Sequence, residues 1–348
     1  MATDPNALPD SIVIAAFEGL KNTVSSERLK PGELERAINV DIDDVGQARR
    51  RRGQRQLSAL PHHSLWLAPS KRLLVVRSGV LGLLLPDNSH VPLTVVGEDP
   101  VAYTEVAGTI YYSSRTHSGK ILPNNTRSAW GATDGTSRWV SPVVRPTETL
   151  GPVAGRALSA PPLASLLEGW NGRLYMGEGR YIWATEVFSY DYVDKARNFL
   201  QFEADLTVLI AVDDGLYVGA EDGLHFLTGQ LSKGLVRRTV STSPIVRGSA
   251  VRVPADVTGV GLQRGGEAEL AVMMLSEAGV LVCSNGGKVV NTTTGRVVFP
   301  GAQDAAVLHR DDSGVSSYLA VTRSGGGPAT NARIGDHVDA EIRRAQGS

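Results

Sequence analysis

A short strand-turn-strand pattern recurs along this chain and limits the possible folds more than any other feature of the sequence. The segment Gly172-Arg173-Leu174-Tyr175-Met176-Gly177 is echoed by Gly215-Leu216-Tyr217-Val218-Gly219, and weaker echoes lie at 72–76, 108–112 and 279–283. Each copy leads into a Gly-rich turn and then into a second apolar strand. Asn-Gly and Asp-Gly turns between apolar runs are strong signals of a β-hairpin, because the tight turn needs positive φ. The predicted turns are Ser78-Gly79, Ser118-Gly119, Gly177-Glu178-Gly179, Glu221-Asp222-Gly223 and Asn285-Gly286-Gly287.

The spacing of these copies indicates the architecture. Taking Leu73, Ile110, Leu174, Leu216 and Leu281 as equivalent points gives intervals of 37, 64, 42 and 65 residues. Intervals near 40 match one four-stranded propeller blade, and the longer ones fit a blade with an insertion or two short blades. We therefore predict an all-β, β-propeller-like domain over 61–323, with about five blades, give or take one or two. A β-sandwich built from similar hairpins is the alternative.

Helical signals are few. Three short stretches carry them: Glu33–Ile38 as a single turn, Ser232–Arg238, and Asp336–Ala345, where Val338 and Ile342 stand four apart. We expect the last of these to form a short helix in a C-terminal tail, 324–348, that follows a Gly-rich hinge.

The side chains that carry chemistry are scattered. None of the seven histidines has the i, i+4 spacing of a helical metal site, and the single cysteine, Cys283, lies in an apolar strand. Nucleophile, phosphate-loop and dinucleotide motifs are absent from the sequence. Carboxylate pairs such as Asp213-Asp214 fall at predicted turns, where Asp suits the turn geometry. The sequence predicts a protein without enzymatic activity, cofactor or catalytic metal.

Charge and hydropathy limit the kinds of partner that the protein can bind. The formal net charge of −1 gives no global field that would attract DNA or an anionic membrane. The longest apolar runs are too short to span a bilayer, and the first ten residues do not resemble a secretory signal. We expect synthesis in a cytosol without membrane insertion.

Residues 1–60 differ from the rest. Their apolar residues are sparse, and acidic residues are followed by the run Arg49-Arg50-Arg51-Arg52-Gly53. A basic run can bind nucleic acid, but no aromatic residues interleave with these arginines as a base-stacking surface would require. We predict an extended arm that makes an assembly contact.

The arm also carries a motif. Its residues are Phe17, Gly19, Leu20, Pro31, Gly32, Asn39, Asp41, Gly46, Arg50, Arg52 and Gly53. This pattern, about a tenth of the chain, resembles the start of tail proteins of the nozzle or "stabilisation protein" type from short-tailed bacteriophages.

The resemblance implies a structural virion protein of the tail, made in the cytoplasm of the bacterial host. It would form a homo-oligomeric ring of six copies around the channel for genome ejection and would dock on the portal/adaptor complex or other tail proteins. Genomic DNA would pass through the lumen without sequence-specific binding. A propeller enzyme or lectin acting on host-surface polysaccharide is the alternative, and assembly behaviour separates the two.

Overall fold

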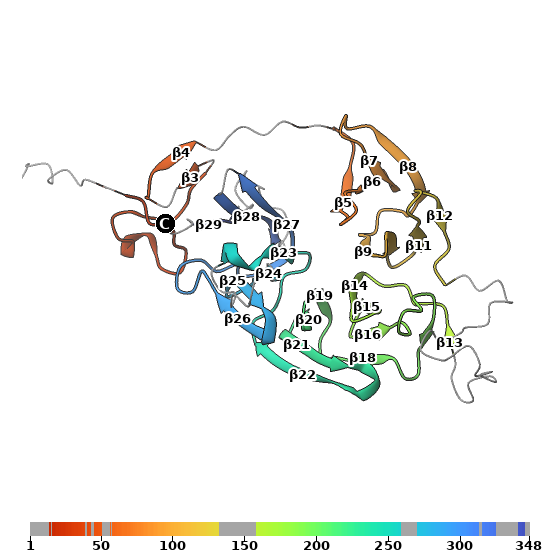
Figure 1. Cartoon of the computed structure of the whole chain (residues 1–348). Coiled ribbons are helices and arrows are strands. Elements are labelled where there is room, and N and C mark those ends of the chain that lie inside the picture. Colours follow the sequence, from red (N-terminus) through yellow and green to blue (C-terminus); the bar gives the residue numbers. More distant parts are fainter. Residues whose placement is uncertain are drawn as a thin grey trace, which may run out of the picture.

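The fold is a series of antiparallel sheets arranged around an open arc (Figure 1). The computed structural model describes residues 14, 16–38, 40–42, 45–50, 56, 58–131, 158–258, 270–312, 315–324 and 340–344. In these residues five four-stranded sheets and one three-stranded sheet follow one another along the chain. We call them blades 1 to 6. Each four-stranded blade keeps its strands in sequence order, so each is a simple meander.

Blades 1 to 3 occupy the first half of the arc. Blade 1 consists of β5 (His62–Leu67), β6 (Leu73–Arg77), β7 (Val80–Leu84) and β8 (His90–Val95). Blade 2 consists of β9 (Ala102–Val106), β10 (Thr109–Ser113), β11 (Ser118–Ile121) and β12 (Arg127–Ser128). Blade 3 consists of β14 (Leu166–Trp170), β15 (Arg173–Glu178), β16 (Tyr181–Ala184) and β18 (Phe199–Gln201), and beside it β13 (Leu158–Ser159) pairs with β17 (Val193–Asp194).

Blades 4 to 6 complete the arc. Blade 4 consists of β19 (Leu206–Val212), β20 (Gly215–Ala220), β21 (Gly223–Gln230) and β22 (Gly234–Ser241). Blade 5 consists of β23 (Val251–Pro254), β24 (Leu270–Ser276), β25 (Gly279–Ser284) and β26 (Lys288–Asn291). Blade 6 consists of β27 (Ala302–Asp312), β28 (Val315–Ser324) and β29 (Ala340–Arg344). Figure 1 shows β9, β14 and β19 toward the centre of the arc and β8, β18 and β22 at its periphery.

The repeated Gly-x-Leu-Tyr-type strand is the second strand of a blade, buried on both faces. In β20, Leu216 and Val218 pack toward blade 3, whereas Tyr217 between them packs toward blade 5. Side chains alternate across a strand, so a strand between two neighbours needs apolar residues at every position. Tyr111 of β10 and Tyr175 of β15 likewise face the following blade.

Each pair of consecutive blades shares one buried apolar cluster. The five clusters join blades 1 and 2, 2 and 3, 3 and 4, 4 and 5, and 5 and 6. No such cluster joins blade 6 to blade 1 in the described part of the chain. The predicted all-β, propeller-like fold is confirmed, and the predicted range of blade number includes the six observed sheets. The chain does not form two stacked sheets, as a β-sandwich would.

The structure corrects several local predictions. Gly234–Ser241 is strand β22, preceded by a 3-10 turn at Leu231–Lys233, instead of a helix over 232–238. Glu33–Leu34 is a short strand, β2. The predicted tail helix is wrong for 340–344, because this segment pairs with β28 and places Ile342 opposite Tyr318. In each case hydrogen bonds to a neighbouring strand outweigh a weak local helix preference.

One predicted turn was misplaced as well. Ser118-Gly119 lies inside β11, and the turn comes before it, where the Ser114 backbone N–H donates to the carbonyl oxygen of His117. Gly119 stands opposite Tyr112, and a Cβ there would lie 2.2 Å from the hydroxyl oxygen of Tyr112. This glycine therefore makes room for a cross-strand aromatic ring and is not a turn residue.

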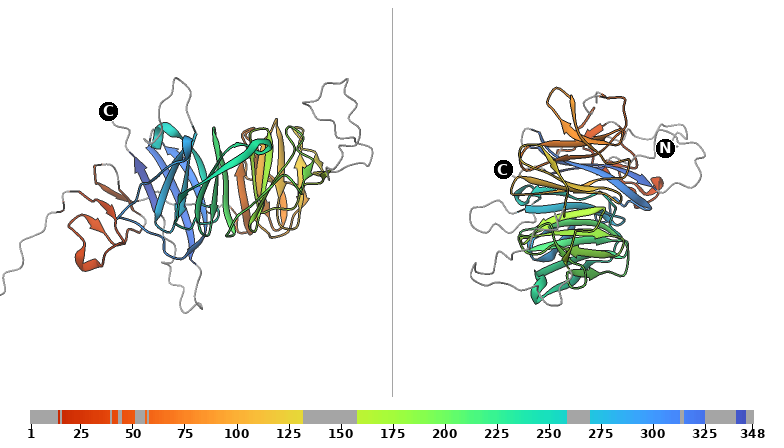
Figure 2. Two further views of the ribbon diagram at one scale, coloured as in Figure 1. Left: turned by 90° about the horizontal axis from the view of Figure 1, so that it is seen from below. Right: turned by 90° about the vertical axis from the view of Figure 1, so that its right-hand side faces the viewer.

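The N-terminal segment forms a small unit beside blades 5 and 6, which we call the arm (residues 14–50). Its strands are β1 (Gly19–Leu20), β2 (Glu33–Leu34), β3 (Val40–Ile42) and β4 (Ala48–Arg50), with a 3-10 turn at Ser26–Arg28. These strands pair among themselves: β1 is parallel to β2, and β3 is antiparallel to β4. Figure 2 shows the arm projecting beyond blade 6 at one end of the molecule.

Candidate assembly interface

Two glycines of the N-terminal motif close the arm around its own backbone. The backbone N–H of Glu18 donates to the carbonyl oxygen of Gly32 at 2.7 Å, and that of Phe17 donates to Gly46 at 2.8 Å. Both glycines are buried, with φ of +97° and +80°. A Cβ on Gly32 would lie 2.8 Å from the carbonyl oxygen of Ala16, and one on Gly46 would lie 2.5 Å from the Ala16 Cβ. The segment 16–18 therefore passes through a slot that glycine alone leaves open.

The paired strands continue this arrangement. Gly19 and Leu20 stand opposite Glu33 and Leu34. The ammonium of Lys21 donates to Glu33 Oε1 at 2.7 Å, and this hydrogen bond, with a backbone N–H from Lys30, holds the pKa of Glu33 below its ordinary value. The motif thus encodes a folded unit and not a loose strand.

The arm is fastened to the connection between blades 5 and 6 of its own chain. Asn22 makes three hydrogen bonds: its backbone N–H donates to Arg296 at 2.9 Å, its Nδ2 donates to the carbonyl oxygen of Val298 at 2.8 Å, and its Oδ1 accepts from the Val298 N–H at 2.9 Å. Thr23 Oγ1 donates to the carbonyl oxygen of Gly295, and Arg296 donates to that of Glu18. The sequence did not indicate this anchor, since Asn and Thr are ordinary surface residues.

The predicted contact residues divide into two groups. Phe17, Gly19, Leu20, Gly32 and Gly46 build the inside of the arm. Pro31 and Arg50 are exposed, and Asp41 is half-buried, directly opposite Arg49 in the β3–β4 hairpin. Asn39, Arg52 and Gly53 lie outside the described residues. Of the described contact residues, Pro31 and Arg50 are therefore the ones exposed to a partner protein.

Exposed apolar side chains on the arm are a feature that the sequence did not indicate. Ile38 is 64% exposed, Val45 62% and Ile14 47%. All three residues of β4, Ala48–Arg50, are exposed as well. The arm thus presents aliphatic and basic side chains together, which suits a protein partner better than a bare phosphate backbone.

An ion pair and a hydrogen bond from one arginine link the innermost strands of three blades. Arg252 of β23 donates to Glu168 Oε1 of β14 at 2.6 Å and, through Nε, to the carbonyl oxygen of Ala211 of β19 at 3.3 Å. Burial raises the pKa of Glu168, while the charge and hydrogen bonds of Arg252 oppose that rise. The two residues are 84 positions apart, so no sequence pattern links them.

The cysteine and a buried histidine, which could carry chemistry elsewhere, are packed within the blades. Cys283 is buried in β25, as predicted, and burial raises the pKa of its thiol. His225 contacts Thr239 and Asp222. Over the described residues, no group of three His, Cys, Asp or Glu side chains is placed to hold a metal ion, and no helix is long and apolar enough to cross a membrane.

Comparisons with known proteins concern the fold alone. No family model matches the sequence, and no curated protein matches it. Among solved structures, the chain is similar to BBS1N in complex with ARL6DN (TM-score 0.47, 12% identity, 87% of this chain and 84% of that one). It is also similar to a streptogramin B lyase (TM-score 0.44, 10% identity, 82% and 84%). A virginiamycin B lyase from Staphylococcus aureus is a third (TM-score 0.42, 9% identity, 81% and 84%).

Proposed function

We propose that this protein is a structural component of a short phage tail, forming a ring around the ejection channel and docking through its arm on a neighbouring tail protein. The observation that supports this most is the arm. It is internally closed by Gly32 and Gly46, fixed to the propeller by Asn22, and presents Ile38, Val45 and Arg50 to the outside. A rigid projection with exposed apolar and basic side chains is what a docking element requires.

The charge balance is compatible with a DNA channel. Each phosphate that a protein neutralises adds affinity, so a strongly basic lumen would retain a passing duplex. The net charge of −1 over 348 residues provides no such global attraction.

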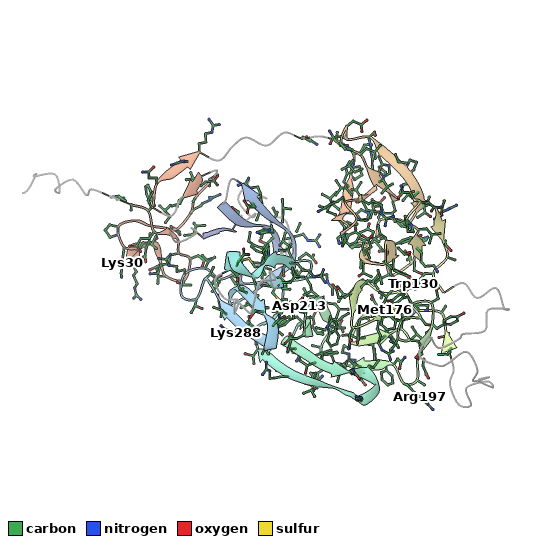
Figure 3. All side chains as sticks on the ribbon, in the orientation of Figure 1. Lys30, Trp130, Met176, Arg197, Asp213 and Lys288 are labelled. Carbon is green, nitrogen blue, oxygen red and sulfur yellow. The ribbon has the colours of Figure 1, made fainter. Side chains whose placement is uncertain are left out.

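The test removes or reverses the arm. A chain lacking residues 1–53 should keep the melting transition of the propeller but should not enter tails, because the docking surface is gone. Arg50→Glu should weaken incorporation most strongly at low salt, and the difference from the unsubstituted protein should shrink as salt is raised, since screening reduces both the lost attraction and the new repulsion. Arg197→Glu is the matched control: this arginine is also exposed but lies on blade 3, across the molecule from Lys30 of the arm (Figure 3). Normal incorporation of the truncated chain would contradict the proposal.

One observation favours a second candidate, a polysaccharide-binding surface. Tyr181 and Trp183 stack at 5.6 Å on β16, Phe199 stands opposite Trp183 on β18, and Tyr181 and Phe199 are 37% and 41% exposed. Amphipathic rings at a surface can serve as binding platforms. Binding of host envelope polysaccharide that is lost in Tyr181→Ala would support this candidate, whereas unchanged binding or none would exclude this surface.

A further inference from the structure

The β3–β4 ribbon of the arm is a sheet without a core beneath it. Each strand has three residues, the two pair only with each other, and no third strand joins them among the described residues. In the described part of the arm only Gly32 and Gly46 are buried, so no apolar side chain is buried there. A two-stranded ribbon is marginal in water unless a further strand or a packed face supports it. The ribbon is therefore an incomplete sheet.

The four strands of the arm differ in exposure. Every residue of β1, β2 and β3 is half-buried, whereas every residue of β4 is exposed. One edge of β4 pairs with β3, and no described strand lies along the other edge. An edge strand presents a row of N–H and C=O groups that can pair with a strand of another chain. The outer edge of β4 is such a row.

The register of the ribbon shows what an added strand would meet. Arg49 stands opposite Asp41, and Arg50 stands opposite Val40. Successive residues of a strand point to opposite faces, so the two arginines lie on opposite faces of the ribbon. A strand added along β4 would place one residue beside each arginine. Carboxylates at these two positions would be attracted, and a second pair of cations would be repelled.

We propose that the outer edge of β4 binds an extended segment of another protein by strand addition, and that this segment carries two adjacent acidic residues beside Arg49 and Arg50. Main-chain hydrogen bonds provide the affinity in this mode of recognition, and the side chains provide the specificity. The inference rests on the proposed function for its setting, since it names the way in which the arm contacts the neighbouring tail protein.

Nucleic acid is the competing ligand for two exposed arginines, and the strand edge argues against it. The edge contains carbonyl oxygens as well as N–H groups, and carbonyl oxygens repel phosphate. A protein strand satisfies both kinds of group. The exposed side chains of Ile38 and Val45 on the same arm add aliphatic contact area, which suits a protein partner.

The test uses a capped peptide with the sequence Thr-Val-Glu-Glu-Val-Thr, which reads the same in both directions and so can pair in either orientation. A second peptide with Lys-Lys in place of Glu-Glu reverses the charge. The acidic peptide should bind the full-length protein, and the backbone amides of residues 48–50 should then exchange hydrogen more slowly. The amides of β20 in blade 4 should be unaffected, and the basic peptide should not bind.

Substitutions of Arg50 measure the charge contribution. Arg50→Glu should lower the affinity for the acidic peptide about tenfold, because an attraction is replaced by a repulsion at an exposed site. Arg50→Lys should keep most of the affinity. Arg197→Glu, at an exposed arginine of blade 3, should leave it unchanged. All three proteins should melt at the temperature of the unsubstituted protein, since both arginines are exposed.

Other outcomes overturn the proposal. Peptide binding without slower exchange at 48–50 would mean a contact through side chains alone. Equal binding of the two peptides, or no binding of either, would mean that β4 does not select an acidic strand. A DNA duplex that slows exchange at 48–50 when the acidic peptide does not would identify a nucleic-acid site.

The strand site and the tail function can fail separately. Binding of the acidic peptide at β4 in a protein that is absent from virions would refute the tail function and leave the site standing. Incorporation into virions that requires residues 1–53, in a protein that does not bind the acidic peptide, would refute the site and leave the tail function standing.

Discussion

Removal of the Arg252 guanidinium should destabilise the propeller far more than neutralisation of its partner. Glu168 has a side chain 9% exposed, whereas that of Arg252 is 40% exposed. In Arg252→Met the carboxylate loses its charged partner and keeps a backbone N–H from Gly169 at 3.0 Å. Breaking a buried ion pair from one side costs about 3–5 kcal/mol, and the partial exposure of Arg252 places the expected cost near the lower limit, about 3 kcal/mol.

This cost can be converted into a melting temperature. With an unfolding entropy of about 2.1 cal/mol/K per residue over this chain, a loss of about 3 kcal/mol lowers Tm by about 4 °C. Glu168→Gln alone should cost less, because the arginine left behind can be solvated. Glu168→Gln combined with Arg252→Met should recover most of the loss, since no buried charge remains. Calorimetry of the four proteins measures all three differences and their coupling.

The pH dependence provides the decisive check. Burial raises the pKa of Glu168 above its ordinary value of 4.5, so the folded state holds this proton more tightly than the unfolded state does. The stability associated with this group is therefore complete below about pH 4.5 and decreases as the pH rises through the folded-state pKa. Arg252→Met should widen that range, and its Tm should approach that of the unsubstituted protein in acid. A loss below about 0.5 kcal/mol at neutral pH, or a loss that stays the same in acid, would refute the reasoning.

Two further predictions concern the arm and the cysteine. Gly46→Ala should open the arm to proteolysis, because the added Cβ would lie against Ala16 and the positive φ would add about 1–3 kcal/mol of backbone strain. Gly19→Ala bears the strain alone, since nothing lies within 4 Å of its added Cβ, so equal cleavage of the two variants would contradict this prediction. Cys283 should not react with a thiol reagent in the native protein and should give one equivalent in denaturant, because burial both shields the thiol and raises its pKa; fast native labelling would contradict the described packing.

The repeat could be predicted because blade packing imposes it locally. A strand between two sheets must be apolar on both faces, and this requirement produces Gly-Leu-Tyr-Val-Gly at 215–219 and its echo at 172–177. The turn between β6 and β7 was equally predictable: Ser78 and Gly79 have φ of +49° and +75°, as the tight hairpin demands. The long interval from Leu216 to Leu281 was ambiguous, and the structure shows that blades 4 and 5 are neighbours with no blade between them.

What the sequence could not indicate depends on residues far apart in the chain. Asn22 binds the backbone at Arg296 and Val298, more than 270 positions away. The ion pair between Glu168 and Arg252 is of the same kind. Neither contact uses a residue type or a sequence spacing that would distinguish it from ordinary surface residues. The motif in the arm could be recognised, but its physical purpose, a slot between Gly32 and Gly46, requires coordinates.

The arm and the uncovered blades have a common structural origin. A propeller whose blades form a closed ring has no uncovered blade face. Closure would bring the first and last parts of the chain together, in one blade or in two neighbouring blades. Here the described arm strands pair with one another and not with β27–β29, so blade 6 keeps three strands. Asn22 and Thr23 bind the connection at 295–298, which holds the N-terminal segment beside blade 5 instead of between blades 6 and 1. The anchor that makes the arm a projection therefore also keeps it out of the opening between blades 6 and 1.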